Sequence, residues 1–178
     1  MRIRQAVAGT HAGAVRTFNE DAVLRLGRVP LYAIADGMGG PDAGDVAAQL
    51  SLDVVKRHAM TIRDHNIALT RERSAEHRRA LQRSLDSVFN RASQQIREEA
   101  ARRGKSVMGA SLVLCTIADE YAYIAHVGDA RAYLVRGGTL QRLTEDHTLA
   151  ELKLRRGRIQ ATKIKEVEQQ RQHCIFYL

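Results

Sequence analysis

The stretch that decides the fold is Leu31-Tyr32-Ala33-Ile34-Ala35-Asp36-Gly37-Met38-Gly39-Gly40-Pro41. Its first five residues are almost entirely apolar and predict a β-strand, and Asp36 follows directly at the end of that strand. Three glycines and a proline in residues 36–41 predict that the strand stops there and a tight loop begins. This pattern places a carboxylate at one end of a sheet.

The residues before this strand predict its partner. Residues 22–26 are mostly apolar and are joined to the strand by Gly27-Arg28-Val29-Pro30, a connection typical of a β-hairpin. Further upstream, apolar and polar residues alternate from Ile3 to Gly9, which predicts another strand, and a loop leads from there to residue 19. The hairpin brings the start of the 22–26 strand to the same sheet end as Asp36.

The residues after the loop change from strand-like to helical periodicity. Apolar residues recur three or four apart over 43–59 and again over 81–96, so two amphipathic helices are expected, the second ending at Gly104. Strand-like patterns return over 110–118, 121–127 and 132–136 and predict an antiparallel meander. Strands, two helices and further strands indicate the α+β class, with the helices gathered on a sheet face.

Composition limits the classes of function. The chain has 178 residues, enough for one domain, and it contains no apolar stretch long enough to cross a membrane. No secretory signal is recognised, so we expect a cytoplasmic location. The net charge is +8, but the basic excess falls in the helical stretch and the tail, and only five Tyr and three Phe are present for base stacking. A nucleic-acid partner is therefore not expected.

Several acidic residues are expected to gather at the end of the sheet. Glu20 and Asp21 begin the strand that pairs with the one ending at Asp36, and Asp129 follows the 121–127 strand. Clustered carboxylates repel one another unless a cation neutralises them, and oxygen ligands without Cys or His favour Mg²⁺ or Mn²⁺. Arg16, four residues before Glu20, has the guanidinium group suited to bind a phosphate oxygen.

Taken together, these segments form five motifs in a fixed order. They read Arg16-x-x-Asn19-Glu20-Asp21, Ala35-Asp36-Gly37-Met38-Gly39-Gly40, Gly109-Ala110-Ser111, His126-Val127-Gly128-Asp129-Ala130-Arg131 and Leu143-Thr144-x-Asp146-His147. The chain thereby resembles the type 2C, metal-dependent Ser/Thr protein phosphatases over residues 1–159. Met38, in place of the His usual in animal members, looks like the bacterial branch.

The resemblance implies a fold and a set of site residues. The expected fold is two packed antiparallel β-sheets flanked by helices, an α-β-β-α sandwich. By the same resemblance, Asp36 bridges two metal ions and the Gly37 carbonyl contributes to one of them. The metal shell includes Glu20 and Asp21, and Asp129 is associated with a more weakly held third ion. Arg16 matches the phosphate-binding arginine.

The implied reaction is hydrolysis of phosphoserine and phosphothreonine in proteins. A water molecule that bridges the Mn²⁺ or Mg²⁺ ions attacks phosphorus, and the enzyme opposes bacterial Ser/Thr kinases. Phosphorylated proteins are the expected partners. The alternative is a catalytically weak or inactive module that binds phosphoproteins.

The last residues depart from the family pattern. Residues 160–178 match none of the later family motifs, and no Asp follows Asp146, so the domain is expected to be C-terminally incomplete and its tail helical or disordered. Three explanations stay open: a fragment, a natural short form with a weakened metal site, or a degenerate member. A shortened phosphatase is favoured because Arg16, Asp21, Asp36 and Asp129 are all present. Sheet edges left exposed predict dimerisation.

Overall fold

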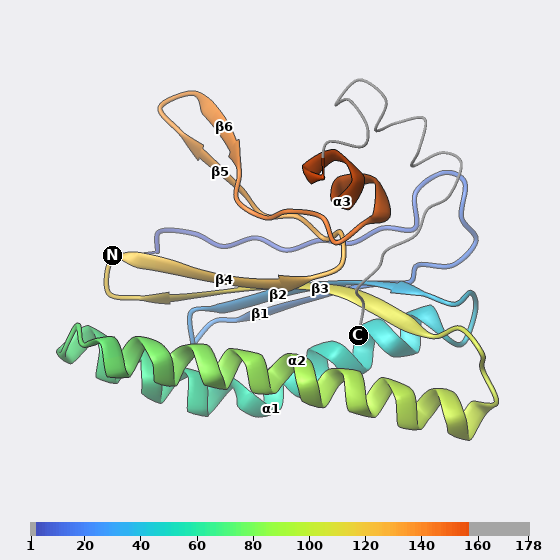
Figure 1. Cartoon of the computed structure of the whole chain (residues 1–178), viewed down its shortest axis with the longest axis horizontal. Coiled ribbons are helices and arrows are strands. Elements are labelled where there is room, and N and C mark those ends of the chain that lie inside the picture. Colours follow the sequence, from blue (N-terminus) through green and yellow to red (C-terminus); the bar gives the residue numbers. More distant parts are fainter. Residues whose placement is uncertain (1–2, 157–178) are drawn as a thin grey trace.

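The computed structural model describes residues 3–156. A four-stranded antiparallel sheet in the order β1-β2-β3-β4 forms its centre, and a separate hairpin of β5 and β6 forms a second antiparallel sheet (Figure 1). The elements are β1 (Asp21–Leu26), β2 (Leu31–Met38), α1 (Gly44–Arg71), α2 (Ala75–Arg103), β3 (Gly109–Ala118), β4 (Tyr121–Val127), β5 (Tyr133–Arg136), β6 (Thr139–Arg142) and α3 (Leu149–Arg155). The predicted α+β class with two antiparallel sheets and helices is confirmed.

The main core lies between the four-stranded sheet and the helical hairpin of α1 and α2 (Figure 1). Alternate residues of β2 face this core, and Leu31, Ala33 and Ala35 are buried there. The helices contribute large apolar side chains from one stripe each, including Ile62 of α1 and Ile96 of α2. Burial of these side chains supplies most of the stabilisation that the helices gain, because helix propensity alone is weak.

Helix α1 comes close to the sheet because its sheet-facing residues are small. Ala47, Ala48 and Ser51 are fully buried in its first two turns. This end of α1 packs against β2 and β3, whereas α2 packs chiefly on α1. The close approach brings the first turn of α1 to the end of β2, beside Asp36.

Three predictions about the regular elements differ from the structure. The first helix continues to Arg71 instead of ending near residue 59. The predicted helix is too short because the polar Asn66 interrupts the apolar stripe. In the structure this side chain is buried and donates a 2.7 Å hydrogen bond to Thr116 Oγ1. Strand β2 continues to Met38, since Gly37 pairs with Ala110 of β3. The strand predicted over residues 3–9 is absent from the described chain, where Val7 is 81% exposed.

The end of the predicted meander also differs. The segment expected over 132–136 forms β5, but its partner is β6 and not β4. Gly137 and Gly138, both with positive φ, form the turn that folds β6 back on β5. Strand β6 and helix α3 were not predicted, and the predicted tail over 160–178 lies outside the described residues.

Candidate metal centre

The hairpin of β1 and β2 positions two carboxylates side by side. In the antiparallel register, Asp21 at the start of β1 lies opposite Asp36 near the end of β2, and Ser111 of β3 lies on the other side of Asp36. Residues that lie opposite each other in adjacent strands point to the same face of the sheet. Both carboxylates therefore project from the face of the sheet that α1 and α2 do not cover.

The electrostatics of Asp36 show that three acidic groups share this region. Burial raises the pKa of Asp36 from 3.8 to about 6, and the Asp21 carboxylate adds to the increase by repulsion and by a side-chain hydrogen bond. Asp129 raises this pKa further, while Arg16 opposes the shift. Asp21, Asp129 and Arg16 therefore all influence the charge of Asp36.

Glu20 lies between the rim of the site and the first turn of α1. Its Oε2 accepts a 3.3 Å hydrogen bond from Nη1 of Arg16, whose side chain is 65% exposed. Its Oε1 is buried and has no hydrogen-bond partner among the described residues. The positive end of the α1 dipole favours a carboxylate oxygen at this position. The structure thus places Glu20 where it holds Arg16 near Asp36.

Two glycines make this arrangement sterically possible. A Cβ atom on Gly37 would lie 1.9 Å from the carbonyl oxygen of Gly44, and one on Gly44 would lie 2.3 Å from Glu20 Oε1. The backbone N–H of Gly37 also donates a 3.1 Å hydrogen bond to the Glu20 carbonyl. The end of β2, the start of α1 and Glu20 therefore meet without room for a methyl group at either glycine.

A small cavity opens in front of the carboxylates. It has a volume of about 210 Å³ and is lined by the loop before β1, the first residue of β1 and one residue of β2; the lining residues are His11, Ala12, Arg16, Phe18, Asn19, Glu20, Asp21 and Asp36. Asn19 fixes the loop, because its Oδ1 accepts from the Asp21 N–H at 3.1 Å and its Nδ2 donates to Thr10 Oγ1 at 2.8 Å. The contributions of His11, Phe18 and Gly44 were not predicted. For His11 and Phe18, the sequence signal was the group of turn-forming residues between Gly9 and Thr17, which indicates a loop there.

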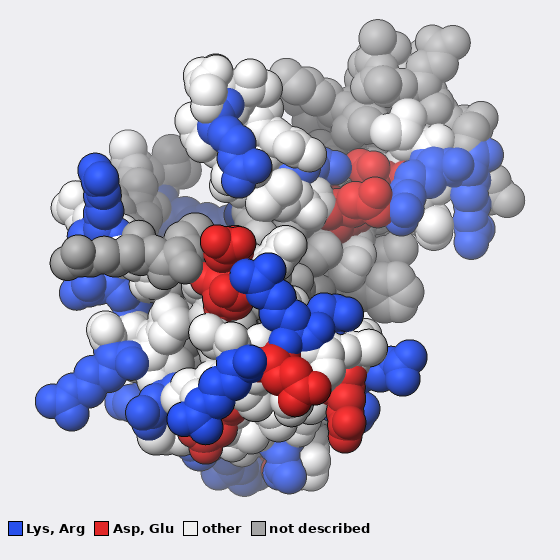
Figure 2. Space-filling view, turned by 90° about the vertical axis from the view of Figure 1, so that its left-hand side faces the viewer, with Lys and Arg blue, Asp and Glu red and all other residues white. Residues whose placement is uncertain are grey.

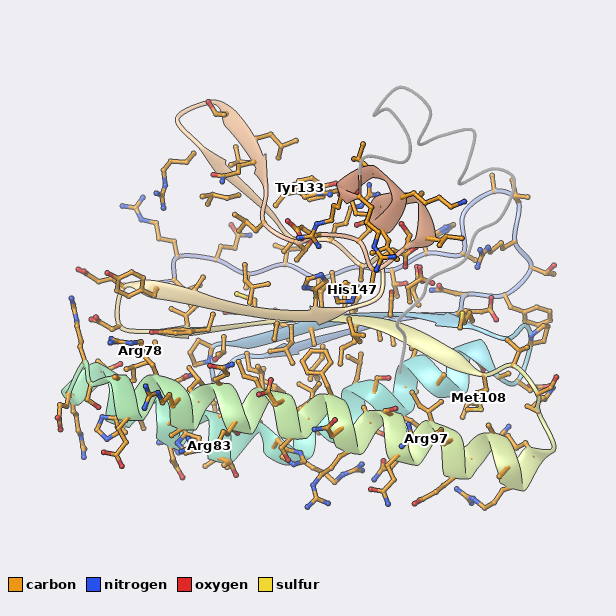
Figure 3. All side chains as sticks on the ribbon, in the orientation of Figure 1. Arg78, Arg83, Arg97, Met108, Tyr133 and His147 are labelled. Atoms are coloured by element: carbon orange, nitrogen blue, oxygen red, sulfur yellow. The ribbon has the colours of Figure 1, made fainter. Side chains whose placement is uncertain are left out.

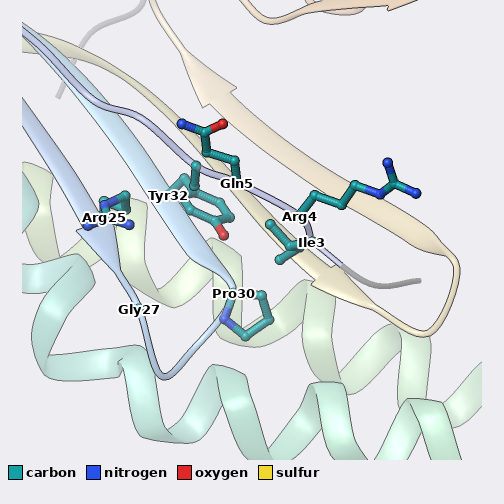
Figure 4. A pocket seen from close by; sticks show the side chains of 8 residues that line it. Ile3, Arg4, Gln5, Arg25, Gly27, Pro30 and Tyr32 are labelled. Carbon is teal, nitrogen blue, oxygen red and sulfur yellow. The ribbon is translucent and has the colours of Figure 1, made fainter.

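A larger cavity lies at the other end of the β1–β2 hairpin (Figure 4). Its volume is about 480 Å³, and its polar lining groups include Arg4, Gln5, Arg25 and Tyr32. It holds no carboxylate and lies roughly 15 Å from Asp36, as judged from the rise per residue of a strand. The smaller cavity is the candidate site because the acidic groups converge there.

The chemistry of the smaller cavity fits a hard divalent cation. Carboxylate oxygens are the donors preferred by Mg²⁺ and Mn²⁺, and Asp21 and Asp36 present them from neighbouring strands. Within residues 3–156, no three His, Cys, Asp or Glu side chains form a complete metal-ligand group. Further oxygen donors, from water, the backbone or other carboxylates, would therefore complete the coordination that Asp21 and Asp36 begin.

Comparison with known proteins identifies the family. The family model described as "Protein phosphatase 2C" matches residues 7–171 of the chain. The chain belongs to this family. It is 33% identical over 153 residues to the serine/threonine phosphatase stp of Listeria welshimeri, and the match covers 84% of this chain and 57% of that protein. The predicted resemblance to bacterial type 2C phosphatases is confirmed.

Solved structures of the phosphatase 2C type share this fold. PppA, described as a regulatory component of T6SS in Pseudomonas aeruginosa, has 34% identity and a TM-score of 0.68, and the match covers 82% of this chain and 58% of PppA. The catalytic domain of PstP, solved in complex with two manganese ions, has 29% identity and a TM-score of 0.70 over 87% of this chain and 61% of that domain. The chain spans just under three fifths of the length of the first curated relatives it matches.

Proposed function

We propose that this chain carries the phosphate-binding and part of the metal-binding machinery of a protein phosphatase that hydrolyses phosphoserine and phosphothreonine. The observation that carries the proposal is the convergence of Asp21, Asp129 and Arg16 on Asp36, whose pKa rises to about 6. Membership of the phosphatase 2C family and the names of the bacterial relatives support the same activity.

In this proposal, the acidic residues hold divalent cations. Asp21 and Asp36 would contribute the principal carboxylates, with Glu20, the Gly37 carbonyl and Asp129 completing the set for two Mn²⁺ or Mg²⁺ ions or for a third. When bound, such ions would lower the pKa of water shared between them and stabilise charge on the phosphoryl oxygens. The manganese ions of the similar PstP domain support this assignment.

Arg16 is proposed to bind the substrate phosphate. Its guanidinium lies at the rim of the cavity, where Glu20 holds it through Nη1 and leaves most of the side chain exposed. The remaining N–H donors are suited to two phosphate oxygens at once, which a lysine ammonium cannot contact with the same geometry. Arg16 would thus orient phosphorus toward the water and stabilise charge that develops on the phosphoryl group.

The proposed substrates are phosphorylated proteins, and the proposed role is to oppose Ser/Thr kinases. Relatives named serine/threonine phosphatases support this choice of substrate. The cavity itself is polar and open, so it accommodates a phosphoamino acid presented on a protein surface more readily than it encloses a small ligand.

We further propose that the chain forms dimers. Strands β1 and β4 are the outermost strands of the four-stranded sheet, and outer strands offer unpaired backbone groups to another chain. Sedimentation velocity over a hundredfold range of protein concentration tests this, and a single monomeric species throughout would contradict it.

The activity is tested by phosphate release from a phosphothreonine peptide. We expect release in millimolar Mn²⁺, loss of release on adding excess EDTA, and loss in Asp36→Asn. Asp64→Asn is the matched control, since Asp64 is exposed on α1 and outside the cavity. Tight binding of the peptide with no release at any Mn²⁺ concentration would favour the phosphoprotein-binding module over the enzyme.

A further inference from the structure

Residues 128–132, which include Asp129, are hydrogen-bonded to residues 144–147. The N–H of His147 donates to the Gly128 carbonyl at 3.0 Å, and the Gly128 N–H donates to His147 Nδ1 at 3.3 Å. Three residues after Asp129, the Ala132 N–H donates to the buried Thr144 Oγ1 at 3.0 Å. Asp129 is therefore anchored on both sides.

An ion pair between Arg131 and Asp146 also joins these two segments. Nε of Arg131 donates to both carboxylate oxygens of Asp146, at 2.9 and 3.0 Å, and Nη2 donates to Oδ2. The Asp146 side chain is only 3% exposed, and its one other cationic neighbour among the described residues, Arg142, lies 3.6 Å away. A buried carboxylate strongly requires such a partner, so the pair fixes the position of Arg131, two residues from Asp129.

A stacked pair of histidines extends the connection to β4. The rings of His126 and His147 stack with centroids 4.8 Å apart, and His126 Nε2 donates to the Glu145 carbonyl at 2.7 Å. Figure 3 shows His147 beside the sheet, on the face opposite α1 and α2. Strand β4, the Asp129 segment and residues 144–147 thus form one rigid unit, which we call the Asp129 clamp.

We propose that Arg131 and Asp146 are positioning residues that hold the Asp129 carboxylate in place for a divalent cation. This inference rests on the proposed function, in which Asp129 helps to complete the set of cation ligands. The Asp129 side chain is exposed, so the anchors at Gly128 and Arg131 set where it points. Ordering a loop before a ligand binds reduces the entropy lost on binding, and loss of such supporting contacts weakens metal sites about 10- to 100-fold.

The test is a Mn²⁺ titration of the full chain, in which the electron paramagnetic resonance signal of free Mn²⁺ is followed. We expect Arg131→Gln to weaken the Mn²⁺ site to which Asp129 contributes about tenfold, by analogy with other supporting contacts, and Arg131→Lys to weaken it less. Arg142→Gln is the matched control, because it removes the longer contact to Asp146 and a 3.7 Å contact to Glu151 but leaves the Arg131–Asp146 pair in place, and we expect no change.

A double-mutant cycle separates positioning from a general loss of structure. If Arg131 acts through Asp129, then Arg131→Gln has no further effect on Mn²⁺ affinity in an Asp129→Asn background. Additive effects, or unchanged affinity in Arg131→Gln, would overturn the inference. Circular dichroism verifies folding, and Arg131→Lys replaces Arg131→Gln in the cycle if the latter is unfolded. A wild-type chain that binds no Mn²⁺ overturns the proposed function, whereas binding that is insensitive to Arg131 overturns only the clamp.

Discussion

At the scale of single residues, Asp36 combines function with a cost in stability. Its raised pKa means that the folded state binds the proton more tightly than the unfolded state does. The stabilisation from this proton is complete below pH 3.8 and is lost as the pH rises through about 6. At neutral pH the metal-free protein therefore holds a charged carboxylate in unfavourable surroundings.

Asp36→Asn is accordingly expected to stabilise the metal-free protein at pH 7.5. The rise in the pKa of Asp36 from 3.8 to about 6 corresponds to about 3 kcal/mol, and solvent screening of this exposed group reduces the expected gain to about 1 kcal/mol. Urea unfolding in EDTA measures the difference, with Asp64→Asn as the control. A less stable Asp36→Asn protein would show that the carboxylate makes a net favourable contribution without metal.

Gly37 is expected to tolerate no side chain. Gly37→Ala would force a methyl group against the Gly44 carbonyl, which is backbone and has little freedom to move, so we expect a loss of about 3 kcal/mol in the free energy of unfolding. In Gly27→Ala the methyl group meets no atom within 4 Å, so that variant should unfold at nearly the wild-type urea concentration. Equal midpoints for the two variants would contradict the close contact.

The site residues on the β1–β2 hairpin could be predicted from the sequence, whereas some of those on α1 and on the loop before β1 could not. Asp21 and Asp36 could be placed together because a hairpin fixes which residues lie opposite each other. Gly44, His11 and Phe18 could not, since they reach the site through the docking of α1 and the path of an irregular loop. Neither of these follows from a local pattern of apolar residues.

At the scale of elements, the contact between β4 and the 144–147 segment depends on a neutral histidine. Nδ1 of His147 accepts a hydrogen bond from Gly128, and a protonated Nδ1 could not do so. Burial lowers the pKa of His147 from 6.5, and the neighbouring His126 and Arg155 add to the decrease, while Asp146 and Glu145 oppose it.

His147→Asn is expected to flatten the pH dependence of stability. Because the folded pKa of His147 is lowered, its contribution to stability is present above pH 6.5 and is lost as the pH falls through the lowered folded value. Asparagine keeps an acceptor oxygen near the position of Nδ1 but does not titrate. Urea unfolding between pH 7.5 and 5 measures both proteins, and equal slopes would contradict the role of His147.

Regular elements with unbroken patterns were predicted well. Strands β1 to β4 follow runs of apolar residues, and α2 ends at Gly104, whose φ of 63° is the left-handed conformation typical of a helix C-cap. The predictions that were wrong concern which strand a segment pairs with. The segment over residues 3–9 finds no strand to pair with in the described chain, and β5 pairs with β6 because of the Gly137–Gly138 turn.

At the scale of the whole molecule, the charges are mixed on the surface. Figure 2 shows acidic side chains among the more numerous basic ones on the end of the molecule that it presents. Arg73 pairs with Asp119 and lies 3.5 Å from Glu120, and Arg102 and Arg103 both pair with Glu99 on α2.

No helix within residues 3–156 is long and apolar enough to span a membrane.

The two faces of the four-stranded sheet should respond differently to truncation of side chains. Leu112 on the helix-covered face is fully buried, so Leu112→Ala is expected to cost about 3 kcal/mol. Ile34 on the other face is 49% exposed, so Ile34→Ala should cost less than about 1 kcal/mol. Thermal unfolding measures the two variants, and a larger loss for Ile34→Ala would show that a second core covers that face.

The length of α1 also separates the two ends of the molecule. With 28 residues, α1 extends about 42 Å from Gly44 beside the site to Arg71. The turn from α1 to α2 around Glu72 lies at the far end (Figure 1). A fluorophore attached at Glu72 would therefore report binding of a phosphorylated protein through slower tumbling while leaving the cation ligands undisturbed.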